Sequence, residues 1–252
     1  MKKIFFINLV IIALLSLVHF GCSSTPGKDI TTDDPEEALR IAKTKYDNED
    51  YTDAIEDLSF IKIKFPGTNI SDRVEFYLAD SYYHRKEYIL GAYEFETMIK
   101  NYPLSPLLPE AHYKLGLCYY ELSPKYSLEQ EYTIYAINEL QAFIEVYSNN
   151  KNVPDAESKL HDLKNKLAYK DFRTAELYMK MDDYKSAAIY YNNVVENYID
   201  SDYADAALVG QAEALINAKK FGEAEKVLEK FYKLFPNSKL KPAADKLKNS
   251  LS

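Results

Sequence analysis

Side chains that could perform catalysis are few in this sequence, and they do not fall into catalytic spacings. The chain has no G-x-S-x-G motif and no phosphate-binding or dinucleotide-binding glycine loop. Its histidines form no H-E-x-x-H motif and lie at no metal-ligand spacing from a cysteine; they are His19, His84, His112 and His161. Carboxylates are abundant, but solvated faces of amphipathic helices explain them. A glycosidase-type pair stays open, since its acids need not be close in sequence. The sequence therefore predicts no enzyme, no catalytic residue, no cofactor and no metal site.

Cys22 is the residue with the most specific chemical context. It follows Gly21 at the end of an apolar run, residues 4–18, which Lys2 and Lys3 precede. The run is shorter than the ~20 residues that a helix needs to span a bilayer. This order resembles a bacterial lipoprotein signal, in which the cysteine thiol receives a diacylglycerol and becomes the mature N-terminus.

The resemblance implies three segments at the start of the chain. Residues 1–21 would be a lipoprotein signal peptide, Cys22 the lipid attachment site, and residues 22–34 a lipidated flexible tether. His19 and Phe20 depart from the family pattern, which has leucine and a small residue there. A plain secretory signal with an incidental cysteine is the alternative.

Cys118 is the second cysteine. If Cys22 carries a lipid, Cys118 has no partner for an internal disulfide. It lies within LGLCYY on an expected helix, where we expect a buried structural thiol rather than a reactive one.

A repeated pattern of small, aromatic and proline residues predicts the helices of this chain. A small residue is followed nine residues later by an aromatic one, three further on by a second small residue, and fifteen after the aromatic by proline. The pattern occurs at Ala42, Tyr51, Ala54, Pro66; at Ala79, Tyr88, Gly91, Pro103; at Ala212, Phe221, Ala224, Pro236; and at Ala175, Tyr184, Ala187, with Ile199 in place of proline. Small residues let paired helices approach closely, and the prolines end each second helix.

We therefore expect an all-α superhelical solenoid of five tetratricopeptide-type helix pairs plus a C-terminal capping helix, in one domain at 35–252. An ordinary helical bundle is the alternative. The third unit is irregular, with a surplus at 123–132 read as a long loop between its helices, and an insertion at 149–154 delays the fourth. The expected units are about 35–67, 71–104, 108–149, 155–200 and 202–237, with the cap at 238–252.

Composition limits the partners. The formal net charge is −8, which argues against a nucleic-acid or anionic-lipid surface because both favour Lys and Arg. The chain has 23 tyrosines and no tryptophan, which suits helices with many amphipathic contact positions. We expect a surface that binds other polypeptides.

A candidate substrate-binding groove lies on the face formed by the first helices. Tyr46, Tyr83 and Tyr120 are 37 residues apart, one in each of the first three units. The same expected face includes Arg73, Phe76, Asp80 and Tyr113. Tyrosine buries apolar area at little entropic cost and keeps a hydroxyl for hydrogen bonding. The groove would accept an extended peptide, but the same tyrosines could instead pack between neighbouring pairs.

The chain also resembles BamD-like assembly lipoproteins of the outer membrane. The resemblance rests on the Gly21-Cys22 signal and on five units whose second helices close with FP, YP, YS, YI and FP. The fourth unit carries the family's "LA…A..Y….Y.AA" pattern at Leu167, Ala168, Ala175, Tyr178, Tyr184, Ala187 and Ala188. Ile199-Asp200 departs from the family, which has proline after the tyrosine.

The resemblance implies a lipid-anchored protein on the periplasmic face of the outer membrane. Its partners would be a BamA-type barrel insertase, held by the C-terminal units, other assembly lipoproteins, and unfolded outer-membrane proteins, held by the N-terminal units. A periplasmic adaptor of the Tol-Pal or cell-division type is one alternative, and a cell-wall enzyme or its activator is another.

Overall fold

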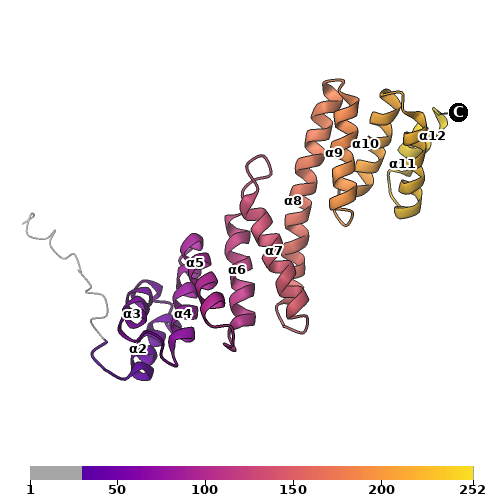
Figure 1. Ribbon diagram of the computed structural model, residues 1–252. Coiled ribbons are helices and arrows are strands. Elements are labelled where there is room, and N and C mark those ends of the chain that lie inside the picture. Colours follow the sequence, from indigo (N-terminus) through magenta and orange to yellow (C-terminus); the bar gives the residue numbers. More distant parts are fainter. Residues whose placement is uncertain (1–29, 252) are drawn as a thin grey trace, which may run out of the picture.

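The computed structural model describes residues 30–251, and every regular element in that range is an α-helix. The helices follow one another in chain order along an elongated array (Figure 1). They are α2 (Pro35–Asp47), α3 (Tyr51–Lys64), α4 (Ser71–His84), α5 (Tyr88–Asn101), α6 (Leu108–Leu122), α7 (Glu131–Val146), α8 (Val153–Lys180), α9 (Tyr184–Asn197), α10 (Ala204–Asn217), α11 (Phe221–Leu234) and α12 (Lys241–Asn249). None of the helices between residues 30 and 251 is long and apolar enough to cross a membrane.

Each helix packs mainly against the helices before and after it in the chain. The first helices of successive pairs, α2, α4, α6, α8 and α10, also touch one another. Because no pair buries its apolar face alone, each pair needs its neighbours for a core. This arrangement confirms the expected all-α solenoid.

Small residues occupy the closest approaches between helices. Ala42 and Ala54 have no exposed surface. A methyl group at Gly91 would lie 3.2 Å from Cys118 Sγ, and one at Gly116 would lie 2.6 Å from Leu140 Cδ2. The second distance is too short for real carbon atoms, so glycine at 116 lets α6 lie close to α7.

The turns inside four of the five pairs share one backbone feature. Glu49, Lys86, Asp182 and Lys219 have φ angles of 64°, 63°, 58° and 62°. This left-handed region costs an ordinary L-residue roughly 1–2 kcal/mol. The third pair has instead a loop of residues 123–130 between α6 and α7.

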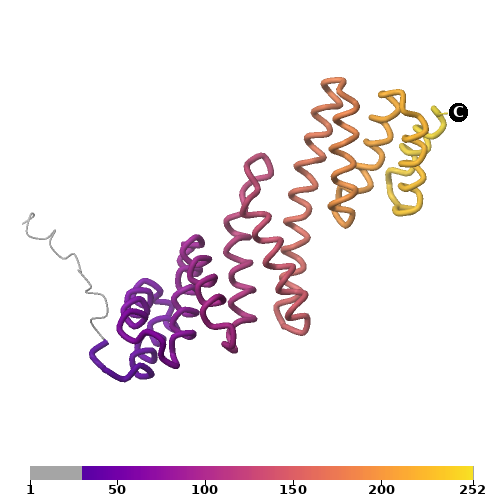
Figure 2. Tube along the Cα trace, in the orientation of Figure 1, coloured from indigo at the N-terminus to yellow at the C-terminus, as the bar shows by residue number. Residues whose placement is uncertain are grey.

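Helix α8 is the element that differs most from the sequence expectation. It is 28 residues long, or about 42 Å at 1.5 Å per residue. The sequence predicts an insertion at 149–154, but α8 already begins at Val153, and the larger surplus is extra helix (Figure 2). In its first half Leu163 joins the core of α6 and α7, and in its second half Ala175 joins the core of α9 to α11. One helix therefore belongs to two cores.

Helix α12 closes the C-terminal end. Ala244 is fully buried there, and Leu247 and Leu251 pack against the same core as α10 and α11. Lysines such as Lys246 on α12 stay exposed. The last pair therefore has a covered apolar face, as terminal repeats require.

Candidate interaction surfaces

Asp80 is the centre of a polar network that joins the first three pairs. Its side chain is almost fully buried and accepts a hydrogen bond of 2.5 Å from the Tyr46 hydroxyl. Lys114 Nζ lies 2.7 Å from the other carboxylate oxygen, and His84 Nε2 lies 3.5 Å from the first. Since Tyr46 comes from α2, Asp80 from α4 and Lys114 from α6, one carboxylate links three first helices.

Tyr83 extends this network along α4. Lys114 Nζ lies 4.7 Å from the centre of its ring, a cation–π distance. Burial raises the pKa of Tyr83 to about 12, and burial together with the charge of Asp80 raises the pKa of Tyr46. Both phenols therefore stay protonated at neutral pH, and the Tyr46 hydroxyl acts as a hydrogen-bond donor.

The same tyrosine–aspartate pairing links α6 to α8. The Tyr113 hydroxyl donates to Asp155 Oδ2 at 2.5 Å, and the Tyr120 hydroxyl lies 3.3 Å from Asp162 Oδ2. Lys159 Nζ lies 4.9 Å from the centre of the Tyr120 ring and 3.4 Å from Asp155. The three α8 residues were missed from sequence because they lie in the extra turns of α8, outside the repeat pattern.

Arg73 and Phe76 complete the seven candidate residues. Arg73 Nη2 lies 2.7 Å from Glu36 Oε1 on α2. Phe76 is 7% exposed, and its ring centre lies 5.8 Å from that of Phe95 in the core. Phe76 therefore packs inside the second pair and offers little surface to a ligand.

All seven candidates contact a neighbouring helix, which favours the interpretation that they pack between helices. Tyr46, Tyr83, Tyr120 and Arg73 keep part of their surface exposed. These four form the part of the face that a partner could reach, which we call the tyrosine face. A binding role for the seven stays a prediction.

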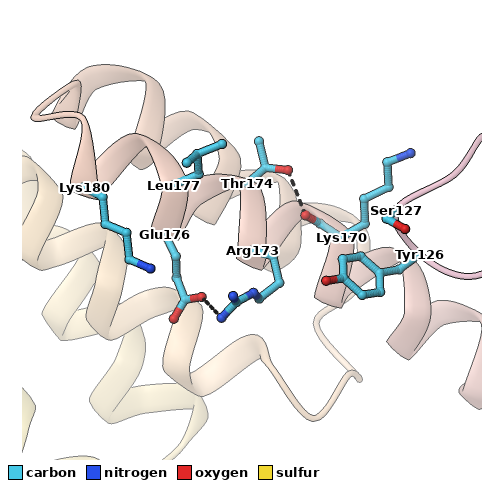
Figure 3. A pocket seen from close by; sticks show the side chains of 8 residues that line it. All are labelled: Tyr126, Ser127, Lys170, Arg173, Thr174, Glu176, Leu177 and Lys180. Carbon is cyan, nitrogen blue, oxygen red and sulfur yellow. Dashed lines mark hydrogen bonds and ion pairs between the residues drawn. The ribbon is translucent and has the colours of Figure 1, made fainter.

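A separate hollow of about 370 Å³ lies between the α6–α7 loop and the second half of α8 (Figure 3). Arg173 points toward Glu176, with 2.5 Å between the charged atoms. Lys170 Nζ donates to the carbonyl of Leu128 in the loop at 2.9 Å. The Lys170 contact ties the loop to α8, and the two contacts together pair the charged groups of Lys170, Arg173 and Glu176, so the hollow indicates no chemistry of its own.

Lys62 lies between two carboxylates at the junction of the first two pairs. Its Nζ atom is 2.9 Å from Glu75 Oε2 and 2.7 Å from Glu94 Oε2. Glu75 is 4% exposed. Burial, opposed by Lys62 and reinforced by Glu94, raises the pKa of Glu75 to about 7. The cluster holds one more carboxylate than cation, and a proton on Glu75 relieves the imbalance.

This raised pKa predicts that stability falls as pH rises from about 4.5 to about 7. In that window the folded chain holds a proton on Glu75 that the unfolded chain has already lost, so raising the pH favours unfolding. Urea unfolding at several pH values measures the slope. Glu75→Gln is expected to remove this part of the dependence, and an unchanged profile in that variant would contradict the assignment.

Cys118 matches the expectation of a structural thiol. It has no exposed surface and is unpaired, and burial raises its pKa to about 12. Cys22 and the expected signal and tether up to residue 29 lie outside the described residues. Within residues 30–251, no three His, Cys, Asp or Glu side chains are grouped so that they could hold a metal ion.

Comparison with known proteins identifies the family. The family described as YfiO, outer membrane lipoprotein, matches residues 31–216, and a tetratricopeptide repeat matches residues 206–238. The outer membrane protein assembly factor BamD of Vibrio cholerae is 26% identical over 79% of this chain and 86% of its own length. Its counterpart in Pasteurella multocida is 24% identical over 81% of both chains.

Among solved structures, the TPR2AB domain of yeast Sti1 in complex with pHSP90 aligns over 86% of this chain and 82% of its own, with 14% identity and a TM-score of 0.42. The family match is the stronger evidence, because it covers well over half of the chain and four of its five helix pairs. The chain therefore belongs to the YfiO family of outer membrane lipoproteins.

Proposed function

We propose that this chain is a non-enzymatic scaffold lipoprotein of the β-barrel assembly machinery. It binds a BamA-type insertase and unfolded outer-membrane proteins while these proteins fold and insert. The observation that carries the proposal is the family match over residues 31–216. The relatives that are similar to this chain over most of its length are named outer membrane protein assembly factors. A lipid on Cys22 holds the scaffold on the periplasmic face of the outer membrane.

The last two pairs, α8 to α11, are the proposed contact for the insertase. Several large apolar side chains on these helices and their turns are exposed: Leu177, Met181, Ile189 and Phe221 are 56%, 63%, 59% and 52% exposed. Met181 follows α8 and Phe221 begins α11, so both lie at the turns inside their pairs. Exposed apolar groups beside polar ones are typical of protein interfaces.

The test is affinity purification of the tagged full chain from detergent-solubilised envelopes, with mass spectrometry of the proteins that co-purify. We expect a large barrel protein with periplasmic repeat domains. The double variant Met181→Glu and Phe221→Glu is expected to reduce its recovery at least tenfold, since a buried charge disrupts an apolar contact. Val146→Glu is the matched control, because Val146 is 69% exposed on α7, outside these pairs.

Recovery of peptidoglycan-associated or division proteins instead would favour the adaptor alternative and contradict the proposal. The assignment of substrate to the tyrosine face is tested separately, by placing a photo-crosslinking residue at Tyr46 or Tyr83. Cross-links to an unfolded outer-membrane protein are expected at both sites and not at Val146. Equal cross-linking at all three positions would contradict a specific groove.

A further inference from the structure

A partly enclosed cavity of about 200 Å³ lies between the first and second pairs, and none of its lining residues belongs to the two surfaces assigned above. It is bounded by the end of α3, the turn that follows, the start of α4 and the end of α5; its lining residues include Ile61, Phe65, Val74 and Tyr102. A cavity of 150 Å³ is known to hold a benzene ring, so this one has room for a ring or a branched alkyl group.

The polar groups of the lining are the side chains of Lys62, Ser71 and Glu75 and the hydroxyl of Tyr102. Ser71 is 8% exposed, and its hydroxyl oxygen has no hydrogen-bond partner among residues 30–251. A buried hydroxyl without a partner costs about 1–3 kcal/mol, so a ligand that donates to it gains by satisfying it.

The polar side of the cavity, around Lys62 and Glu75, carries more negative than positive charge. Lys62 supplies one positive charge, whereas Glu75 and Glu94, both within 2.9 Å of its Nζ atom, supply two negative ones when ionised. The two further cations nearest along the chain are engaged elsewhere. Lys64 Nζ lies 2.9 Å from Asp33 and 2.8 Å from the carbonyl of Thr32, and Arg73 Nη2 lies 2.7 Å from Glu36 Oε1. A buried group of this kind favours a second cation.

The apolar side of the cavity suits the alkyl or aryl part of an organic cation. Phe65 and Tyr102 bring aromatic rings to the cavity, and aromatic faces attract cations as well as apolar groups. One position of the Phe65 ring is already occupied, since Lys64 Nζ lies 5.1 Å from its centre. The Tyr102 ring forms the second aromatic wall of the cavity.

We propose that this cavity binds an organic ammonium group, with the cationic nitrogen between the Glu75 carboxylate and the Ser71 hydroxyl and the alkyl or aryl body against the apolar walls. The ammonium displaces the proton that otherwise neutralises Glu75, so binding releases a proton near neutral pH. The ligand is either a free amine or a lysine side chain of a bound polypeptide, and both present the same chemistry.

The experiment is calorimetric titration of the full chain in neutral detergent with benzylamine, compared with benzyl alcohol as its uncharged counterpart. We expect one saturable site for benzylamine and at least tenfold weaker binding of the alcohol. Since Glu75 ionises near pH 7, benzylamine affinity should rise about tenfold between pH 6 and pH 8. Titration in two buffers of different ionisation enthalpy should show the released proton.

Glu75→Gln is expected to lower benzylamine affinity at least tenfold and to abolish its rise with pH. Glu229→Gln, at an exposed position on α11, is the matched control and should change neither. Ser71→Ala, which leaves every charge in place, should weaken binding several-fold, and it keeps the test valid if Glu75→Gln lowers the thermal stability too far.

A titration with Nα-acetyl-lysine methylamide separates the two sources. Tighter binding than that of butylamine indicates a lysine side chain, and the reverse order indicates a free amine. Equal affinity for benzylamine and benzyl alcohol, no binding of either, or an affinity that does not change with pH would overturn the proposal. None of these outcomes depends on the insertase, so failure here leaves the proposed function standing.

Discussion

Replacing Asp80 with alanine is expected to lower the free energy of unfolding by about 3–5 kcal/mol, which is the usual cost of removing one partner of a buried ion pair. The variant leaves the Lys114 ammonium without its carboxylate, and Lys114 itself is only 16% exposed. It also leaves the Tyr46 hydroxyl without the acceptor that it contacts at 2.5 Å. Urea unfolding followed by circular dichroism measures the loss.

A double-mutant cycle identifies the cause of this loss. Asp80→Ala combined with Lys114→Met should be less destabilised than the sum of the two single variants, because no unpaired charge remains buried. Asp47→Ala is the control, since Asp47 is 52% exposed and its pairing with Lys43 is solvated. It should leave stability nearly unchanged. Strict additivity in the cycle would show that Asp80 does not act through Lys114.

Proline at position 166, in the middle of α8, is expected to destabilise the chain by about 3 kcal/mol or more. Proline removes one backbone hydrogen bond of the helix, and its ring clashes with the carbonyl of residue 162. Position 166 lies between Leu163, in the core with α6 and α7, and Ala168, in the core with α9 to α11. The kink should therefore separate the two cores, and unfolding should split into two transitions.

Lys166→Ala is the matched control for this prediction. Both variants lose the 2.7 Å contact between Lys166 Nζ and Ser123 Oγ, but only proline breaks the helix. Thermal unfolding by circular dichroism, with small-angle scattering to follow the length of the array, measures both effects. A single cooperative transition in Lys166→Pro would mean that α8 does not couple the two cores.

The fold could be predicted from sequence because its main constraint is periodic. Ala42, Ala54 and their equivalents are small where helices approach, and the structure leaves them without exposed surface. The length of α8 could not be predicted in the same way. Its extra turns follow no 37-residue repeat. Extra residues in a helix and extra residues in a loop shift the later units along the sequence by the same amount, so the spacing cannot tell them apart.

The candidate site was harder to predict, since packing and binding favour the same residue types. Tyr46, Tyr113 and Asp80 were found from their positions on the first helices, but their pairings were not: Tyr46 pairs with Asp80 across 34 residues, and Tyr113 pairs with Asp155 across 42. That variable separation gives no fixed signal. Phe76 shows a second reason why binding residues are hard to predict. The sequence places this aromatic residue on the expected binding face, but its side chain lies in the core.

The four left-handed turns suggest how this array could be rebuilt. The first, second, fourth and fifth pairs turn at Glu49, Lys86, Asp182 and Lys219 with nearly the same backbone angle. The two helices of each of these pairs therefore meet through the same kind of turn, so the turn of one pair could replace that of another without changing how its two helices meet. The third pair has a long loop in place of this turn, and α8 of the fourth pair also belongs to the core of the third, so these two pairs cannot be exchanged as units. Lengthening or shortening the protein within α8 would therefore disturb a helix that both cores need.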